Sequence, residues 1–218
     1  MPIQHLLTGW QRFRAGRFRD QHALFERIVR EGQRPRVAMV ACCDSRVDPA
    51  IVFDCDPGDL FLVRNVANLV PPFEHGGRYH GTSAALEFAV TVLQVREIIV
   101  LGHSRCGGIG ALLQGPEALA SLPFLGTWMS LVDEARDAAL SPSGLSLEAR
   151  RTLCERRAIQ LSLRNLATFP AIRERVERGA LRLHGWHFDL VDGVLSAYDA
   201  AAAGFVTVDG EGPPEPAS

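Results

Sequence analysis

Apolar runs and helical spacings alternate along the chain and indicate strands and helices in turn. Three continuously apolar runs end in small or polar residues, as buried strands do where they enter a loop; these predicted strands span residues 37–43, 60–63 and 97–101. Helical patterns or long connections separate them, which favours a parallel sheet over a meander. Residues 181–190 and 194–198 flank an Asp-Gly turn and predict a β-hairpin at the edge of the sheet. We therefore predict an α/β fold with a central, mostly parallel β-sheet flanked by helices.

Helical spacing of hydrophobic residues begins near the N-terminus. In residues 2–15, Leu6, Trp10 and Phe13 fall at i, i+4 and i+7, and residues 20–31 repeat the pattern. These helices lie far in the sequence from the candidate chemistry, so we expect them to pack on a partner subunit; the alternative is that they close the core of their own chain. Further helices are predicted at residues 82–93, 109–113, 125–132 and 159–166.

The chain is long enough to bury a core of its own. It has 218 residues, of which 47% are hydrophobic, so it needs no disulfide staples to fold. We expect a single domain over residues 1–208 that begins with a helical arm at residues 1–31. Residues 209–218 are rich in proline, glycine and acidic residues and are predicted to be a disordered tail.

Charge and composition argue against several classes of function. The formal net charge is −2 and there is no basic run, so nucleic acid is not the expected partner. No apolar stretch approaches the roughly 20 residues of a membrane-spanning helix, and residues 1–6 do not resemble a secretory signal. We expect a cytoplasmic protein. Its five cysteines lack the spacing of a disulfide framework, which leaves metal ligands, catalytic groups or buried thiols.

Two short segments that follow predicted strands, residues 41–46 and 102–108, carry the candidate chemistry. The carboxyl ends of parallel strands meet at one edge of a sheet, so Cys42 and His103 should come together. With Cys106 they offer two thiolates and an imidazole, which are ligands that zinc prefers, and they leave a fourth position for water. The pattern predicts a catalytic zinc site with three protein ligands.

Asp44 and Arg46 lie beside Cys42, two positions apart, and can pair on one side of the turn. One interpretation is a structural salt bridge. Beside a metal, however, a guanidinium that keeps the carboxylate ionised lets it accept a hydrogen bond from metal-bound hydroxide and orient it. The remaining cysteines are interpreted as packing thiols; they are Cys43, Cys55 and Cys154. His75 and His80, in a polar loop, are candidates for proton relay.

Taken together, these motifs resemble those of β-class carbonic anhydrases. The matching segments are Cys42-x-Asp44-Ser45-Arg46, Arg64-Asn65-Val66-Ala67-Asn68 and His103-x-x-Cys106-Gly107-Gly108. The similarity runs from about residue 33 to residue 113 and resumes at residues 184–186. The resemblance implies one zinc ion per chain on Cys42, His103 and Cys106, with water or hydroxide in the fourth position. It also implies a catalytic dyad of Asp44 and Arg46, and reversible hydration of CO2 to bicarbonate and a proton.

The resemblance further implies a substrate pocket and an assembly. The substrate-binding positions are Gln33, Phe61, Phe88 and Gly107. Gln33 would hydrogen-bond CO2 or bicarbonate, and Phe61 would form an apolar wall; the family has a tyrosine where Phe88 stands, so its hydroxyl is lost. Active sites of the family lie at a dimer interface with groups from both subunits, and such homodimers often pair into tetramers or larger assemblies.

The resemblance also bears on regulation. One bacterial branch binds bicarbonate at a second, inhibitory site through a Trp, an Arg and a Tyr, where this chain has Met39, Arg64 and Phe188. Residues 69–72 instead resemble the plant-like branch, whose zinc keeps its open position, so we expect Asp44 to stay off the metal at neutral pH. Two alternatives stay open: hydrolysis of carbonyl sulfide or carbon disulfide on the same scaffold, and a non-catalytic zinc–thiolate redox sensor or scaffold.

Overall fold

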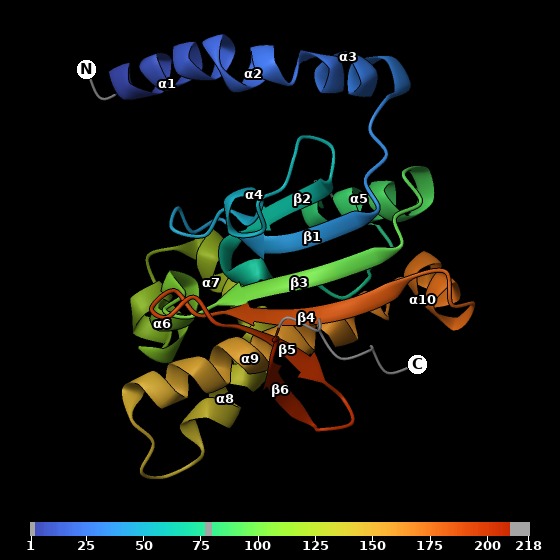
Figure 1. The fold of residues 1–218 in the computed structure, drawn as a ribbon. Helices are drawn as coiled ribbons and strands as arrows, with labels where there is room; N and C mark the ends of the chain where they lie inside the picture. The colour runs from blue at the N-terminus through green and yellow to red at the C-terminus, as the bar shows by residue number, and fades with distance from the viewer. Residues whose placement is uncertain (1–2, 77–79, 210–218) are drawn as a thin grey trace.

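One six-stranded sheet organises the computed structural model, which describes residues 3–76 and 80–209 (Figure 1). Its order is β2-β1-β3-β4-β5-β6, and the strands are β1 (Val37–Cys42), β2 (Leu60–Asn65), β3 (Glu97–His103), β4 (Arg182–Phe188), β5 (Leu195–Asp199) and β6 (Gly204–Thr207). The pairs β1–β2, β1–β3 and β3–β4 are parallel, whereas β4–β5 and β5–β6 are antiparallel. The predicted α/β fold with a mostly parallel sheet is confirmed.

The C-terminal part of the sheet differs from the prediction in one respect. The hairpin of β4 and β5 is present, but β4 lies inside the sheet between β3 and β5, and the unpredicted β6 forms the edge. A four-residue strand that begins with glycine is too short to show a period of two. Most of the predicted tail, from residue 210 onward, lies outside the described residues.

Helices surround the sheet and connect its strands. They are α1 (Gln4–Ala15), α2 (Arg17–Asp20), α3 (His22–Glu31), α4 (Pro49–Val52), α5 (Gly81–Glu87), α6 (Gly107–Leu113), α7 (Pro123–Met129), α8 (Asp133–Leu140), α9 (Leu147–Leu166) and α10 (Pro170–Glu177), with the 3-10 turns η1 (Val66–Asn68), η3 (Pro116–Leu119) and η4 (Ser130–Val132) and the π-helical turn η2 (Phe88–Val92). Ser146 caps α9 by accepting a hydrogen bond from the backbone N–H of Ala149. Among the described residues, no helix is both long and apolar enough to cross a membrane.

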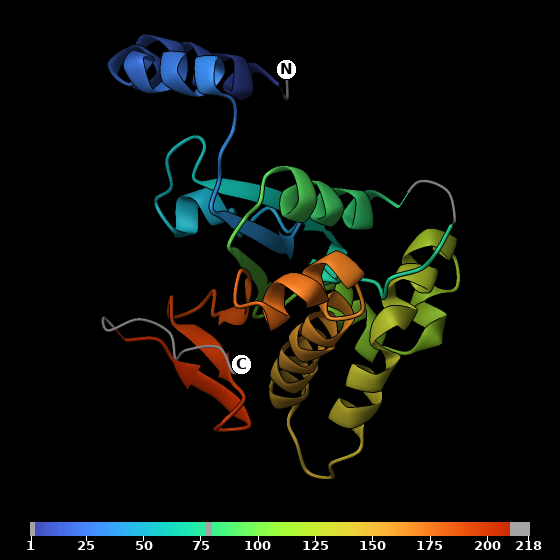
Figure 2. The same ribbon diagram turned by 90° about the vertical axis from the view of Figure 1, so that its right-hand side faces the viewer.

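The two faces of the sheet pack differently. Helices α5, α9 and α10 lie on one face (Figure 2), where Val40, Val100 and Ile159 of α9 belong to one buried apolar cluster. Gly102 and Gly185 allow this close approach, because a Cβ atom at either position would lie 2.7 Å from the Ile159 side chain. The opposite face carries a smaller apolar cluster of β1 and β3 residues that packs with Phe53 and Trp186. The carboxyl ends of β1 and β3 are therefore flanked by the loops that follow these strands, and not by this helical layer.

The N-terminal arm, helices α1 to α3, lies apart from the sheet (Figure 1). None of the three helices has a buried residue, and several large apolar side chains are exposed on α1, including Leu6 and Trp10. Polar contacts tether the arm to the body, since Arg17 and Gln21 both donate to Asp56 Oδ1. The arm is thus helical as predicted, and it does not close the core of its own chain.

Candidate metal centre

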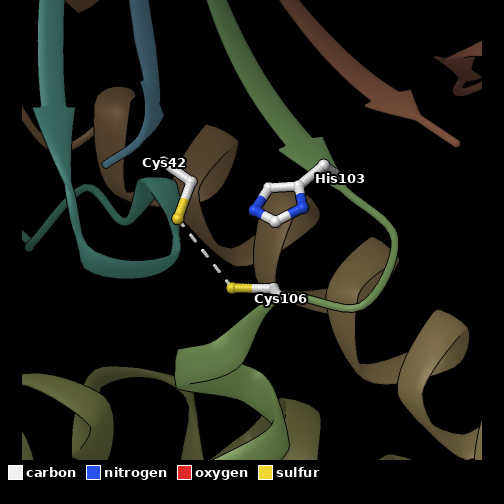
Figure 3. A group of neighbouring side chains, drawn as sticks. All are labelled: Cys42, His103 and Cys106. Atoms are coloured by element: carbon white, nitrogen blue, oxygen red, sulfur yellow. Dashed lines mark hydrogen bonds between the residues drawn. The ribbon is translucent and has the colours of Figure 1, made fainter. Parts of the chain in front are cut away.

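Three side chains from separate parts of the sequence converge at the carboxyl ends of β1 and β3. Cys42 is the last residue of β1, His103 is the last residue of β3, and Cys106 immediately precedes α6 (Figure 3). Their ligand atoms lie within 4.8 Å of one another, and the two sulfurs are 4.0 Å apart. All three side chains are buried. The predicted convergence of Cys42 and His103 is confirmed.

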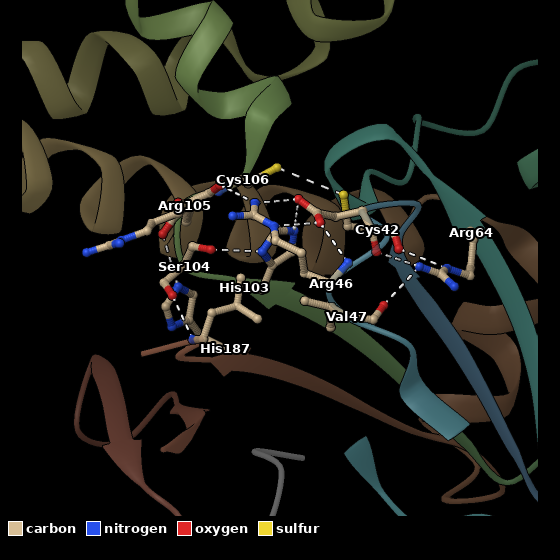
Figure 4. Close-up of polar contacts among 12 residues, drawn as sticks. Cys42, Arg46, Val47, Arg64, His103, Ser104, Arg105, Cys106 and His187 are labelled. Atoms are coloured by element: carbon tan, nitrogen blue, oxygen red, sulfur yellow. Dashed lines mark hydrogen bonds and ion pairs between the residues drawn. The ribbon is translucent and has the colours of Figure 1, made fainter. Parts of the chain in front are cut away.

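A tight loop between β3 and α6 places Cys106 close to His103. Arg105 adopts a left-handed backbone conformation with φ of 58°, which costs about 1 kcal/mol for a non-glycine residue. The Arg46 guanidinium donates to the Arg105 carbonyl at 3.0 Å (Figure 4). Ser104 is buried and anchors the loop from the other side, since its hydroxyl accepts a hydrogen bond from the Leu190 N–H. The loop that sets the His103–Cys106 spacing is therefore held at both flanks.

The orientation of the His103 ring leaves one nitrogen free for a metal. Nδ1 lies 2.9 Å from the Ser104 carbonyl, and because a carbonyl only accepts, we assign the ring proton to Nδ1. Nε2 is buried and has no hydrogen-bond partner among the described residues. An unpaired buried nitrogen beside two sulfurs is costly unless a cation occupies the space between them. Two thiol groups and one imidazole make a donor set that fits zinc.

Electrostatics at the centre favour a cation. The hydrogen bond between the two sulfurs lowers the pKa of Cys42 and raises that of Cys106, so that one thiolate faces one thiol. Burial lowers the pKa of His103, but the nearby Cys42 thiolate, the Ser104 carbonyl and the charge of Asp44 outweigh burial and raise it. The same negative charges would attract a divalent cation, whose binding releases the second thiol proton.

The structure brings Asp44 and Arg46 together beside the three ligands. The guanidinium holds both carboxylate oxygens, with Nε 2.9 Å from Oδ1 and an Nη 2.7 Å from Oδ2. These hydrogen bonds hold the pKa of Asp44 well below its usual range, although partial burial acts in the opposite direction. Oδ2 also lies 3.9 Å from His103 Nε2. The carboxylate is thus ionised and fixed next to the candidate metal position.

Arg64 clamps the loop that follows β1. It donates to the carbonyl oxygens of Cys42, Asp44 and Val47 and to a carboxylate oxygen of Asp48 (Figure 4). Asp48 in turn caps α4 by accepting a hydrogen bond from the Ala50 N–H. Arg64 therefore has a structural role in the chain, independent of any second bicarbonate site.

The expected substrate-binding residues divide into two groups. Gly107 is the first residue of α6, next to Cys106. Phe61 stacks on Phe88 with ring centroids 5.9 Å apart, but it pairs with Ala38 near the start of β1, about 13 Å along the strand from Cys42. Gln33 precedes β1 and is exposed. Within one chain, these last three positions lie at the opposite end of the strands from the metal centre.

Some of the remaining predictions need correction. Cys154 is buried as expected of a packing thiol, but Cys43 is exposed, because it follows the last residue of β1 and faces away from Cys42. Cys55 is only half-buried. The proton-relay role of His75 and His80 stays a prediction; both residues are exposed, and no described contact links them to the metal centre.

Sequence reasoning missed two buried residues at the centre, Glu155 and His187. Glu155 accepts a hydrogen bond from the Cys106 N–H and contacts His187 Nε2. A signal was present, because Glu155 falls four positions before Ile159 and shares the buried stripe of α9. A carboxylate at such a position is rarely tolerated without a partner.

Proteins of known structure and sequence are similar to this chain over most of its length. The family profile for carbonic anhydrase matches residues 37–195. A carbonic anhydrase from Synechocystis is 38% identical over 205 residues, which cover 94% of this chain and 74% of that protein. The solved β-carbonic anhydrase CcaA has a TM-score of 0.89 at 37% identity and covers 96% of this chain and 93% of its own. One structure from a study of two tetrameric β-carbonic anhydrases of Sordaria macrospora has a TM-score of 0.78 at 26% identity, with 90% and 96% covered.

The family profile matches most of the chain, and so does the Synechocystis relative. All three residues of the Cys-His-Cys group lie within the region that the profile matches. The chain therefore belongs to the β-class carbonic anhydrase family, whose members hydrate CO2.

Proposed function

We propose that the chain hydrates CO2 reversibly with one zinc ion held by Cys42, His103 and Cys106. The observation that carries the proposal is the group of three buried ligand atoms within 4.8 Å of one another, with an ionised carboxylate beside them. A zinc ion at this position supplies a Lewis acid and lowers the pKa of a water molecule in its open position. Two thiolates and a neutral imidazole would cancel more of the positive charge of zinc than three imidazoles do. The pKa of the water would therefore fall less than in a three-histidine site.

The catalytic role proposed for Asp44 follows from its contacts. Arg46 occupies both carboxylate oxygens and so keeps Asp44 charged and off the metal. Oδ2 lies 3.9 Å from the free nitrogen of His103, and from there it accepts a hydrogen bond from the nucleophilic water and turns a lone pair of the water toward CO2. Arg46 is the positioning residue of this dyad, since it also binds the Arg105 carbonyl.

The substrate pocket of this proposal contains groups from two chains. Gln33, Phe61 and Phe88 lie at the far end of the strands in their own chain, so they reach a metal centre only in a second copy. Phe88 is 40% exposed, as expected of a side chain that becomes buried only when a second copy of the chain packs against it. The N-terminal arm would pack on that same copy, giving a homodimer that can pair into a tetramer; the relatives from Sordaria macrospora are tetrameric.

The proposal includes a location in the cytoplasm. All five cysteines are free, which is the usual state of thiols in a reducing compartment. Activity on carbonyl sulfide or carbon disulfide has no particular support, because the described contacts do not distinguish these molecules from CO2.

Replacement of Asp44 tests the proposed chemistry. Asp44→Asn keeps the size of the side chain but removes its charge, so we expect turnover to fall roughly 100- to 10,000-fold, the usual contribution of a general base. Zinc content should stay at the wild-type level, because Asp44 is not a ligand. The matched control is Asp137→Asn, an exposed residue of α8, which should leave turnover unchanged. Wild-type turnover in Asp44→Asn would contradict the role proposed for Asp44, whereas a zinc-loaded wild type without turnover would favour a non-catalytic zinc–thiolate scaffold.

A further inference from the structure

Glu155 and His187 form a buried pair behind the metal centre. Glu155 lies on α9 and is 3% exposed, and His187 lies on β4 and is 2% exposed. Glu155 Oε1 accepts a hydrogen bond from the Cys106 N–H at 3.1 Å, and Oε2 lies 3.1 Å from His187 Nε2. Because a carboxylate only accepts, the imidazole donates in this contact. The pair thus connects the longest helix and the fourth strand to one candidate zinc ligand.

A carboxylate at this position is expensive in energetic terms. Its neighbours on the buried stripe of α9 are Ala158, Ile159 and Ser162, and an apolar residue there would avoid the desolvation cost of a buried charge. Both carboxylate oxygens are used, one by a backbone amide and one by an imidazole, which is the arrangement that makes a buried carboxylate tolerable. The packing of α9 against the sheet does not require a carboxylate at this position. A hydrogen bond that fixes the Cys106 backbone does require an acceptor there.

The contact with Cys106 controls where its sulfur points. Cys106 is the N-cap residue of α6 and ends the loop in which Arg105 holds a left-handed conformation. The N–H that Glu155 accepts belongs to the peptide plane between these two residues, so the hydrogen bond fixes that plane. The Cα–Cβ direction of Cys106, and with it the 4.0 Å separation of the two sulfurs, follows from the orientation of this plane.

We propose that Glu155, held by His187, is a positioning residue that preorganises Cys106 for zinc. The inference deepens the proposed function and rests on it. Groups that fix a metal ligand from behind typically alter metal affinity by roughly 10- to 100-fold when they are removed. The role is positional, since neither residue touches the ligand atoms.

The experiment measures zinc affinity by competition with a chelator in Glu155→Ala, Glu155→Gln and the wild type. We expect Glu155→Ala to bind zinc roughly 10- to 100-fold more weakly. Glu155→Gln should lie closer to the wild type, because its amide oxygen can still accept the Cys106 N–H. The cobalt-substituted protein provides a second readout: the thiolate-to-cobalt absorption band should change in Glu155→Ala.

A matched control is available in the same sheet. Glu97 on β3 contacts His184 Nε2 at 2.8 Å, so Glu97→Ala removes a comparable carboxylate–imidazole pair at the opposite end of the strands. Its zinc affinity and cobalt spectrum should match those of the wild type. If Glu155→Ala does not fold, His187→Ala replaces it, removes the donor to Glu155 Oε2, and should weaken zinc binding by about 10-fold or more.

The outcomes separate the two proposals. If the wild type binds zinc tightly and Glu155→Ala matches Glu97→Ala in affinity and spectrum, the positioning role is wrong and the proposed function stands. If His187→Ala has to be used, wild-type affinity in that variant has the same meaning. A wild type that binds no zinc contradicts the proposed function itself.

Discussion

Each candidate zinc ligand is fixed by a second residue that holds another of its atoms. Ser104 accepts from His103 Nδ1, Glu155 accepts from the Cys106 N–H, and Arg64 donates to the Cys42 carbonyl. A single ligand held in this way loses little entropy when the metal binds, because its rotamer and backbone are already set. At the scale of residues, the centre is therefore preorganised by contacts that never reach the metal.

Gly108 provides a test of how tightly the centre is packed. A Cβ at this position would lie 2.8 Å from Val66 Cγ1 and 3.3 Å from Met129 Sδ, so Gly108→Ala should lower the free energy of unfolding by about 1–3 kcal/mol, as overpacking does. The neighbouring control is Gly107→Ala, whose Cβ would meet no atom within 4 Å. Urea unfolding of both variants measures the difference. Equal stability of the two would show that α6 can move away from η1.

The ligands could be predicted at this scale, whereas their supports give only a weak signal in the sequence. Cys42, His103 and Cys106 follow apolar runs, so the fold alone places them at one edge of the sheet. Glu155 and His187 are isolated polar residues within amphipathic segments, where a surface position is the usual interpretation. Only the packing of α9 on β4 brings them together, and that packing depends on Gly185.

At the scale of elements, apolar content decided which segments could be predicted. Strands β1, β2 and β3 each contain a continuous apolar run, and the sequence predicts their bounds within two residues at each end. Helix α8 buries only Ala135 and Ala139, and such small side chains give a weak helical pattern. Helix α10 buries only Ile172, and β6 has four residues; neither is long enough to show a clear period.

The N-terminal arm supplies the prediction at this scale. Trp10 is 55% exposed and Leu6 is 61% exposed on α1, and in the proposed dimer both become buried against the second copy. Leu6→Glu with Trp10→Glu should therefore shift the protein from dimers or tetramers to monomers, and hydration should fall because the pocket is divided between chains. Sedimentation velocity and turnover measured together provide the check. The control Gln11→Glu adds charge to the same helix and should leave the assembly intact, whereas an unchanged assembly in the double variant would contradict this role of the arm.

At the scale of the whole molecule, the metal centre and the proposed substrate-binding residues lie at different ends of the strands. The metal centre lies at the carboxyl ends of β1 and β3, while Phe61 and Phe88 lie near the other end of the strands. Sequence motifs cannot show this separation, because a motif gives the residue types and their order but no distance across the sheet. The division of the chain into an arm, a domain through residue 208 and a tail stays a prediction at this scale.

Stopped-flow CO2 hydration from about pH 6.5 to about pH 9, with zinc content determined on the same sample, tests the central claim most directly. The account predicts one zinc per chain and turnover that rises from neutral to mildly alkaline pH. The reason is that a zinc ion held by two thiolates would lower the pKa of its water less than one held by three imidazoles. A zinc-loaded protein that is inactive at every pH would contradict the claim.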